Sequence, residues 1–451
     1  MTGRFSDPLN MSPLLAITDP ATSPHPALLA PFALLLLAIA VMPLVNHAWW
    51  ERHYPKVALG LASITAAYYG WGLGAPARLG HVLHEYASFI ALIGSLFVVS
   101  GGIHIRVRGG STPGMNVLFL AIGAILANVI GTTGSSMLLI RPWLRMNASR
   151  IAPFHIVFFI FVVSNIGGCL TPIGDPPLFL GYLKGVPFWW VLQTCWPAWG
   201  IGVAMLLAMF HVLDRRSFRS HRPSAATGDG ASGSVAAGEG WGVDGVGNVG
   251  FLALILGAIF LRSPAGLGEG LMLAAALGSY LLTPRGVHLA NNFNLHPVKE
   301  VAWLFLGIFI TMIPALDYLE LHAKGLGLSS PMGFFWLTGG LSALLDNAPT
   351  YLTFLAAAMG LHGLSLGDPA QVRELVATHD HEVVAISIAA VFFGAMTYIG
   401  NGPNFMVKSI AEHARVKVPG FFDYIWRYAL PAMLPVLLLL ALLFFSRWRV
   451  F

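Results

Sequence analysis

Apolar and polar positions follow one another along this chain in long blocks. Runs of roughly 20 apolar residues recur between short polar turns, and a run of that length is typical of a helix that crosses a bilayer. The pattern predicts uninterrupted spans near residues 27–46, 57–74, 84–103 and 188–213, and again near 248–262, 267–283, 300–321 and 424–446. We therefore predict an all-α polytopic membrane protein.

Two further apolar segments carry an interruption with a shared sequence. Residues 151–184 contain LTPIGDPP (Leu170–Pro177), and residues 383–413 contain MTYIGNGP (Met396–Pro403). Glycines and prolines at this density interrupt a helix. Both segments are therefore predicted to be broken helices, and the matching residue order indicates an internal repeat.

Two more apolar segments, about 114–145 and 331–361, are too long for one span and have a polar break in the middle. The breaks are Asn128–Thr133 and Asp346–Thr350. We predict re-entrant hairpins that dip to mid-depth, where irregular backbone is tolerated only if protein encloses it. A pair of ordinary short helices is the alternative.

The elements divide the chain into two repeats, residues 27–213 and 248–446. Each repeat has three spans, a re-entrant hairpin, a broken helix and a final span, so five crossings invert the second repeat relative to the first. Paired interruptions in two inverted halves are typical of secondary transporters with a mid-membrane binding site. Residues 214–247, rich in Gly, Ala and Ser, are predicted to be a flexible linker, residues 1–26 a polar N-terminal segment and residues 447–451 a C-terminal tail.

Composition supports the membrane assignment. Hydrophobic residues make up 56% of the chain and charged residues 10%, against about 25% charged in soluble domains. About 17 of the 25 lysines and arginines fall on the side of the linker, so the linker is predicted to be cytoplasmic and both termini periplasmic. Since the basic residues lie in short loops, the net charge of +5 does not indicate a nucleic-acid partner.

The breaks offer chemistry suited to an ion. Unwound backbone presents carbonyls to a cation, and the half-helix N-termini that follow favour anions. Oxygen-only ligation suits a hard cation such as sodium. The candidate ion- or substrate-binding residues in and around the breaks are Asn128, Thr132, Thr133, Asn165, Thr171, Gly174, Asp175, Asp346, Asn347, Thr350, Thr397, Gly400, Asn401 and Asn404.

Asp175 and Asp346 are the two carboxylates among these candidates. An ionised Asp at the centre of a span costs about 3 kcal/mol even on insertion scales, so it persists there with a cation, a proton or a partner. We hypothesise that one or both exchange a proton for a sodium ion. The alternative is helix capping, because Asp175 precedes Pro176 and Asp346 precedes another helix start.

Other polar groups receive a plainer interpretation. His379–Glu382 resembles a set of metal ligands, but its polar surroundings favour a solvated loop, and Ala385 stands where a zinc-protease motif needs histidine. Lys184 and Lys408 are expected to extend toward the membrane interface. No phosphate-binding loop, nucleophile elbow or dinucleotide fingerprint occurs in a suitable context, so neither an enzyme nor an organic cofactor is expected; the coupling ion would be sodium, a proton or both.

The motifs also carry a resemblance. Ser164–Leu180, SNIGGCLTPIGDPPLFL, resembles the signature shared by arsenite permeases and D-type sodium/proton antiporters of the ion transporter superfamily, and Leu344–Thr350, LLDNAPT, resembles its second-half counterpart. With TYIGNGPNFMVKSIAE (Thr397–Glu412), the chain is most similar to a proteobacterial group of citrate transporters or sodium:proton antiporters. The resemblance covers residues 27–446. It implies a scaffold and a transport domain, elevator-type alternating access, a bacterial inner-membrane location and a homodimer.

The chain departs from this pattern at the hairpin tips. Dicarboxylate members of the superfamily carry Ser-Asn-Thr triplets there, whereas this chain has Asn128–Thr133 and Asp346–Thr350. Asp346 would repel a bound carboxylate unless it were protonated or paired with sodium. We therefore predict a sodium/proton antiporter. The alternatives are a cation-coupled symporter of citrate or another small carboxylate, and an arsenite or oxyanion permease; a membrane enzyme or a channel would not need paired breaks.

Overall fold

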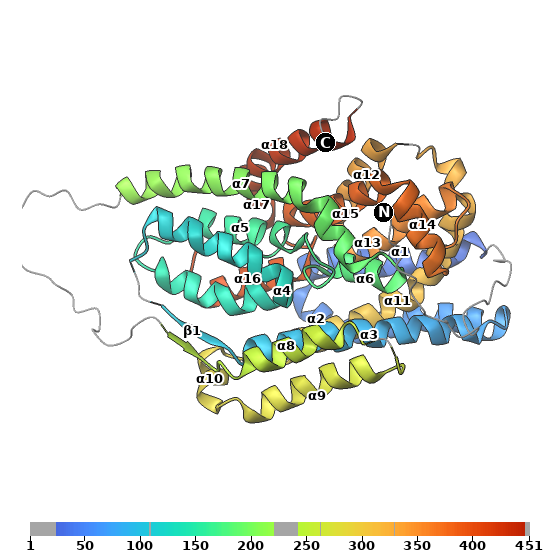
Figure 1. Cartoon of the computed structure of the whole chain (residues 1–451), viewed down its shortest axis with the longest axis horizontal. Helices are drawn as coiled ribbons and strands as arrows, with labels where there is room; N and C mark the ends of the chain where they lie inside the picture. Colours follow the sequence, from blue (N-terminus) through green and yellow to red (C-terminus); the bar gives the residue numbers. More distant parts are fainter. Residues whose placement is uncertain (1–23, 108–109, 221–241, 262, 329, 447–451) are drawn as a thin grey trace, which may run out of the picture.

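The computed structural model describes residues 24–107, 110–220, 242–261, 263–328 and 330–446 (Figure 1). Nearly all regular structure is helical. In chain order the elements are α1 (Leu29–Val45), α2 (His47–Ala67), α3 (Pro76–Gly101), β1 (His104–Arg106), α4 (Pro113–Met146), α5 (Pro153–Val162), α6 (Pro176–Lys184), α7 (Phe188–Ser220), β2 (Gly242–Asp244), α8 (Asn248–Ala258), α9 (Leu267–Leu282), α10 (Arg285–Ala290), α11 (His296–His322), α12 (Pro331–Leu344), α13 (Asn347–Leu361), α14 (Pro369–Thr378), α15 (Asp380–Phe393), α16 (Gly402–His413), α17 (Phe421–Tyr424) and α18 (Leu430–Leu440).

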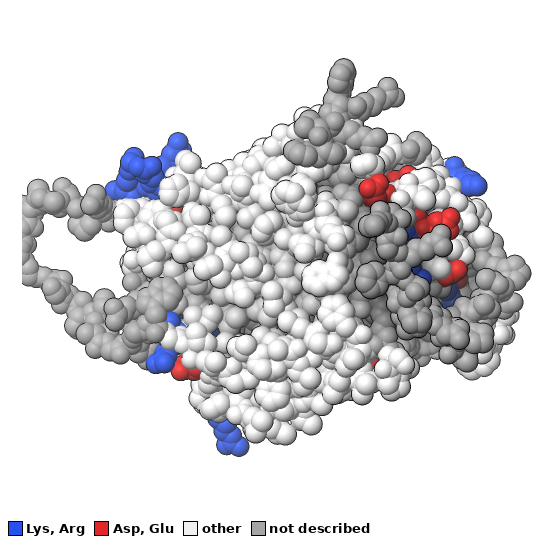
Figure 2. Space-filling model, in the orientation of Figure 1, with Lys and Arg blue, Asp and Glu red and all other residues white. Residues whose placement is uncertain are grey.

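The prediction of an all-α polytopic membrane fold is confirmed. Within the described ranges, six helical runs are long and apolar enough to cross a membrane: Pro26–Val45, Pro76–Gly101, Pro113–Met146, Phe188–Ser220, His296–Gly325 and Phe421–Phe445. The face seen in Figure 2 agrees, because its charged side chains gather at the two ends of the long axis and leave a broad region between them almost free of charge. This uncharged region is what a bilayer would surround.

Helix α4 is folded back on itself. The N–H groups of Gly110 and Ser111 donate to the carbonyl of Met146 at 3.1 and 3.2 Å, although a straight helix of 34 residues would be about 50 Å long. The turn falls at Gly131, whose φ of +77° belongs to the left-handed region that favours glycine. The α4 segment is therefore a helical hairpin with its tip at Gly131, and its re-entrant position in a membrane stays a prediction.

The other interruptions lie where the sequence places them. The segment between α5 and α6 contains one short 3₁₀ turn, Ile166–Gly168, and the segment between α15 and α16 contains another, Gly394–Met396. Between α12 and α13 only Leu345 and Asp346 are non-helical. A further bend, of 100°, separates α14 from the run Asp380–Met396. The sequence pattern gave no sign of α14 as a separate helix.

The predicted linker is shorter than expected at both ends. Residues 214–220 belong to α7, and Gly242–Asp244 forms β2, which pairs antiparallel with β1. Residues 221–241 of the linker lie outside the described residues. Residues 1–23 of the N-terminal segment and the whole C-terminal tail, residues 447–451, also lie outside them.

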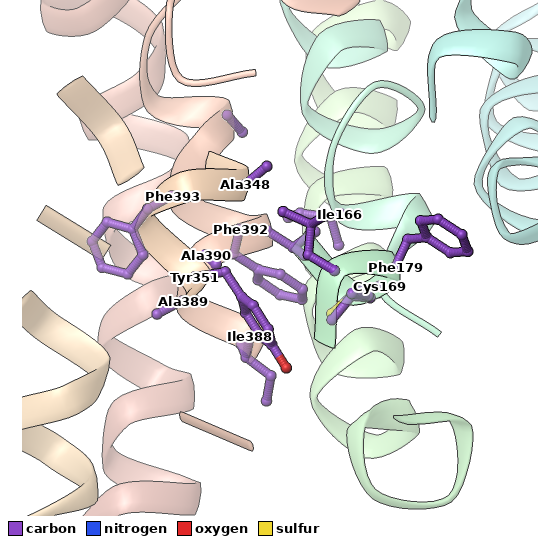
Figure 3. Close-up of a cluster of buried hydrophobic side chains, with 14 of the residues drawn as sticks. Ile166, Cys169, Phe179, Ala348, Tyr351, Ile388, Ala389, Ala390, Phe392 and Phe393 are labelled. Atoms are coloured by element: carbon purple, nitrogen blue, oxygen red, sulfur yellow. The ribbon is translucent and has the colours of Figure 1, made fainter. Parts of the chain in front are cut away.

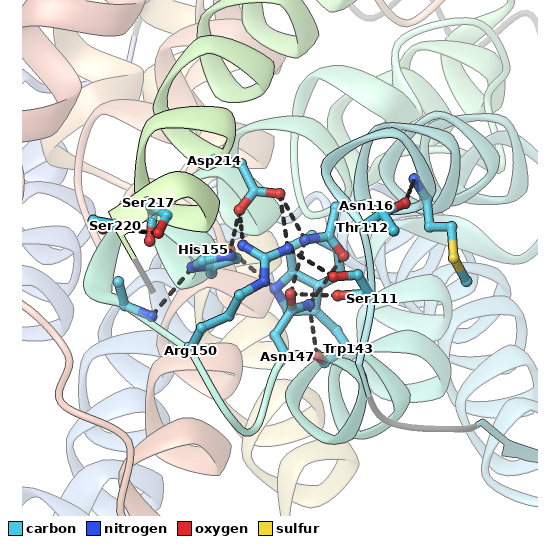
Figure 4. A network of polar contacts seen from close by, with 12 residues as sticks. Ser111, Thr112, Asn116, Trp143, Asn147, Arg150, His155, Asp214, Ser217 and Ser220 are labelled. Atoms are coloured by element: carbon cyan, nitrogen blue, oxygen red, sulfur yellow. Dashed lines mark hydrogen bonds and ion pairs between the residues drawn. The ribbon is translucent and has the colours of Figure 1, made fainter. Parts of the chain in front are cut away.

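A buried polar network explains why α7 extends past the predicted end of its span (Figure 4). Asp214, fully buried, pairs with Arg150 and accepts a hydrogen bond from Asn116 Nδ2 at 2.8 Å. His155 Nε2 lies 3.2 Å from the same carboxylate. A buried charge needs such partners, and they come from the start of α4, the α4–α5 loop and α5. Asp214 therefore holds about two more helical turns of α7 against the first hairpin.

The apolar core joins the two halves of the chain beside the breaks (Figure 3). Tyr351 of α13 and Phe392 of α15 face Ile166 and Cys169 of the first break, and all four are buried. A Cβ on Gly181 of α6 would lie 2.4 Å from the Tyr351 hydroxyl, so glycine permits this close contact. Burying four such side chains contributes several kcal/mol and fixes the breaks relative to one another.

Candidate functional site

Asp175 is the centre of a buried polar cluster. It is 1% exposed and receives three hydrogen bonds, from Thr132 Oγ1 at 2.7 Å, from Asn347 Nδ2 at 2.6 Å and from Asn401 Nδ2 at 3.0 Å. The three donors come from the first hairpin, the second hairpin and the second broken helix. All four interruptions predicted from the sequence therefore meet at one carboxylate.

The partners of Asp175 bear on the choice between capping and an ion-linked role. Asp175 precedes α6, but its side chain makes no capping hydrogen bond to that helix. Among the described residues neither Asp175 nor Asp346 forms a salt bridge with Lys, Arg or His. Three neutral donors stabilise a carboxylate by about 1.5–3 kcal/mol each, yet they leave its charge uncompensated. Such a group suits a cation or a proton.

A set of amides extends the cluster across the two halves. Asn165 Nδ2 donates to Asn404 Oδ1 at 2.7 Å, and Asn401 Nδ2 donates to Asn165 Oδ1 at 3.2 Å and to the Ser164 carbonyl at 3.1 Å. Asn404 Nδ2 in turn donates to the carbonyls of Gly394 and Thr397 at 2.8 and 2.9 Å. Asn165, Asn401 and Asn404 are all buried. They hold the two broken helices together immediately behind Asp175.

The threonines of the repeated motif brace the breaks in the same way. Thr171 Oγ1 donates to the Asn128 carbonyl at 2.6 Å, and Thr397 Oγ1 donates to the Ala343 carbonyl, also at 2.6 Å. Each hydroxyl also accepts, at 3.1 Å, the N–H of the glycine three residues on, Gly174 or Gly400. Both threonines thus tie a hairpin arm to a break.

Asn128 and the motif glycines complete this bracing. Asn128 Nδ2 donates to the Gly167 carbonyl at 2.6 Å, and its Oδ1 accepts from the Leu170 N–H at 2.8 Å. A Cβ on Gly174 would lie 2.0 Å from the Gly168 carbonyl oxygen, and one on Gly400 would lie 2.7 Å from that of Gly394. The structure therefore places Asn128, Thr171, Gly174, Thr397 and Gly400 as supports of the site.

Asn347 provides an oxygen that has no partner. Its Nδ2 binds Asp175, while its Oδ1 is buried without a hydrogen bond within the described part of the chain. Exchanging the two amide atoms would set Oδ1 against the carboxylate, so the charge of Asp175 fixes the orientation. A buried unpaired oxygen costs about 1–3 kcal/mol. Here it lies beside an uncompensated carboxylate, an arrangement that a bound cation would satisfy.

A small cavity adjoins the carboxylate. It has a volume of about 20 Å³ and is lined by Asp175, Thr132, Thr133 and Gly131 together with apolar side chains of α3. A cavity needs about 10–15 Å³ to hold one water, whereas sites for drug-sized molecules run to about 300–1,000 Å³. In this conformation the space fits a water or a small ion.

The hydrogen bonds of Asp346 and Thr350 lie at the start of α13. Asp346 is partly exposed and accepts the Ala348 N–H at 3.0 Å, so it caps α13. Thr350 Oγ1 donates to the Asp346 carbonyl at 2.9 Å within the same helical turn. Asp346 directly precedes Asn347, the partner of Asp175. The structure therefore shows capping at Asp346 and places it one residue from the cluster.

Sequence reasoning missed one charged contact near the site. Lys184 was expected to reach the membrane interface, but it is buried, and its Nζ lies 2.7 and 2.8 Å from the two carboxylate oxygens of Glu85. The pair links α6 to α3. Because the two residues are 99 positions apart and Glu85 lies in an ordinary apolar span, the sequence alone gave no signal for this pairing.

Comparison with protein families gives a match over residues 22–445 to the family described as "Putative citrate transport". The chain belongs to this family. Comparison with curated proteins finds no match. Membership supports a multi-pass membrane transporter and fits the resemblance to the ion transporter superfamily.

Proposed function

We propose that this citrate transport family member is a secondary active transporter that exchanges sodium for protons at Asp175. The observation that carries the proposal is the environment of that side chain: 1% exposed, bound by three neutral donors, and without a basic partner in the described ranges. In apolar surroundings a carboxylate in this position is stable when it holds a proton or a cation. The adjoining cavity of about 20 Å³ suits an ion.

Competition for one carboxylate would couple the two ions. A sodium ion beside Asp175 would also take the free Oδ1 of Asn347, and a proton on Asp175 would neutralise the charge that attracts sodium. Occupancy by one ion therefore excludes the other. Thr132, Asn165, Asn401 and Asn404 would position the carboxylate and Asn347, and Asp346 would raise the local negative potential from the adjacent position.

Alternating access would follow from the grouping of elements. The two hairpins and two broken helices share the cluster and would move together against α1–α3 and α8–α11. We propose an elevator-type movement of this group in a bacterial inner membrane, with the linker in the cytoplasm, both termini in the periplasm and a homodimer as the assembly. The inverted repeat is part of this proposal, supported by the matched contacts of Thr171 and Thr397.

Reconstitution into liposomes tests the exchange. The purified full chain is placed in vesicles loaded with a pH-sensitive dye, and sodium, lithium and citrate are added in turn. Exchange predicts that external sodium alone alkalinises an acidic lumen. A lumen that responds only when citrate is also present would overturn the proposal.

Citrate transport is the second candidate, because the family description names it. The N-termini of α6, α13 and α16 lie at the breaks and could face an anion. Against it stand the uncompensated charge of Asp175 and the size of the cavity. Sodium-dependent accumulation of radiolabelled citrate in the same vesicles would favour this candidate.

A further inference from the structure

A cluster of two histidines and a glutamate lies away from the Asp175 site. His362 follows α13, His379 separates α14 from α15, and Glu382 lies in the first turn of α15. Their ligand atoms all lie within 4.8 Å of one another, and no other such group of three occurs in the described ranges. We propose that these residues form a binding site for a first-row divalent transition-metal cation, with Zn²⁺ as the reference ion.

The geometry brings the ligands together closely. His362 Nε2 lies 2.9 Å from Glu382 Oε2. The rings of His362 and His379 stack with centroids 3.5 Å apart and planes inclined by 18°. Ligand atoms about 2 Å from a tetrahedral zinc ion lie about 3.3 Å apart. The His362–Glu382 spacing is close to that value. Because an imidazole binds a metal in the plane of its ring, one of the two stacked rings has to turn before both can bind the same ion.

Charge and burial also fit a cation. Glu382 is 8% exposed, and its salt-bridge partner in the described chain is His362. Two neutral imidazoles and one carboxylate match the His₂Glu sets that hold zinc in proteins. The partly exposed histidines leave access for the ion and for a water as the fourth ligand.

The sequence interpretation missed this site for a definite reason. His379–Glu382 was interpreted as a solvated loop, whereas the structure places Glu382, which is buried, in the first turn of α15. His379 and Glu382 are three residues apart and share one face of that turn. The third ligand, His362, directly follows the end of α13, 17 positions before His379, so the fold alone completes the set.

The cluster lies where a bound metal would join α13 to α15. α13 carries Asn347 of the Asp175 cluster at its start and His362 after its end, and α15 leads into the break that carries Asn401. A metal held by His362, His379 and Glu382 would clamp the hairpin arm to the start of the second broken span. Binding should therefore slow any motion of these elements relative to each other. The binding claim itself does not rest on the proposed ion exchange.

Metal binding by the purified full chain, free of any histidine tag, tests the site. Zinc content after equilibrium dialysis is measured for the unaltered chain, for His379→Ala and for Glu382→Gln. The unaltered chain should hold one tight equivalent. Each variant should bind it at least about tenfold more weakly, since the loss of an outer-shell partner alone costs that much. His381→Ala is the matched control, because that histidine is 45% exposed and outside the cluster; it should bind zinc as the unaltered chain does.

Thermal unfolding with and without zinc shows whether a variant that no longer binds zinc is still folded. Zinc should raise the unfolding temperature of the unaltered chain and of His381→Ala, and should leave that of His379→Ala unchanged. Absence of a tight equivalent in the unaltered chain would overturn the proposal, and so would an equal loss of zinc in His381→Ala.

Discussion

Asn401 Nδ2 donates a hydrogen bond to Asp175 Oδ1 at 3.0 Å. The two residues hold the same position in the repeated motifs, LTPIGDPP and MTYIGNGP. Each precedes a helix, has an extended backbone and directs its side chain away from that helix without capping it. The residues that correspond in the two halves therefore meet at the centre of the cluster. One half supplies a carboxylate there and the other a neutral amide, so the matched motifs hold a single charge.

Replacing the carboxylate of Asp175 tests whether transport depends on that single charge. Asp175→Asn keeps the size of the side chain and removes the charge that a proton or sodium would neutralise. We expect sodium-dependent proton flux in vesicles to fall by at least about tenfold, the effect of losing about 1.4 kcal/mol of ion stabilisation. Asp368→Asn, at the half-buried capping position of α14, is the control and should transport normally. Flux within a factor of two in Asp175→Asn would contradict the assignment.

Asp346 allows capping and transport to be separated. Asn caps helices about as well as Asp, whereas Ala costs about 1 kcal/mol at such a position. We expect Asp346→Asn to keep the stability of the protein while lowering sodium-dependent flux, and Asp346→Ala to lower both. Thermal unfolding and dye-monitored flux measure the two effects. If Asp346→Asn transports as the unaltered chain does, capping is the whole role of this carboxylate.

The losses of stability caused by replacing Glu85 and Lys184 should be clearly non-additive. Glu85→Gln leaves the buried Lys184 without its carboxylate partner, which costs about 3–5 kcal/mol. Lys184→Met leaves Glu85 with His81, whose Nε2 lies 3.1 Å from Glu85 Oε1, so its cost should be smaller. Lys184→Met and Glu85→Gln should each lower the unfolding temperature. The double variant should be more stable than the sum of the two losses predicts, because it leaves neither charge behind. Additive losses in chemical or thermal unfolding would show that the contact is not energetically coupled.

The sequence predicted which residues meet in the Asp175 cluster better than it predicted the contacts around them, for physical reasons. Breaks in apolar runs must be enclosed by protein, so the motifs around Asp175 and Asn401 pointed to the cluster directly. Contacts such as Asn165 with Asn404 join positions 239 apart, and no local pattern specifies them. Lys184 was placed wrongly for the same reason, because its partner Glu85 comes from another span. The end of α7 was placed too early because Asp214, a charge that suggests exposure, is buried among partners from three other segments.

Gly131 provides a test of the first hairpin. Its φ of +77° strains any L side chain, and a Cβ there would lie 3.3 Å from the carbonyl oxygen of Ile173, two residues before Asp175. Gly131→Ala should therefore destabilise the protein by more than about 1 kcal/mol. It should also lower transport, because the adjacent Thr132 donates to Asp175. Gly114→Ala is the matched control in the same hairpin: nothing lies within 4 Å of its Cβ position, and alanine favours helix, so stability should hold or rise. Thermal unfolding and vesicle flux measure both variants, and equal behaviour of the two would show that the tip does not need its left-handed turn.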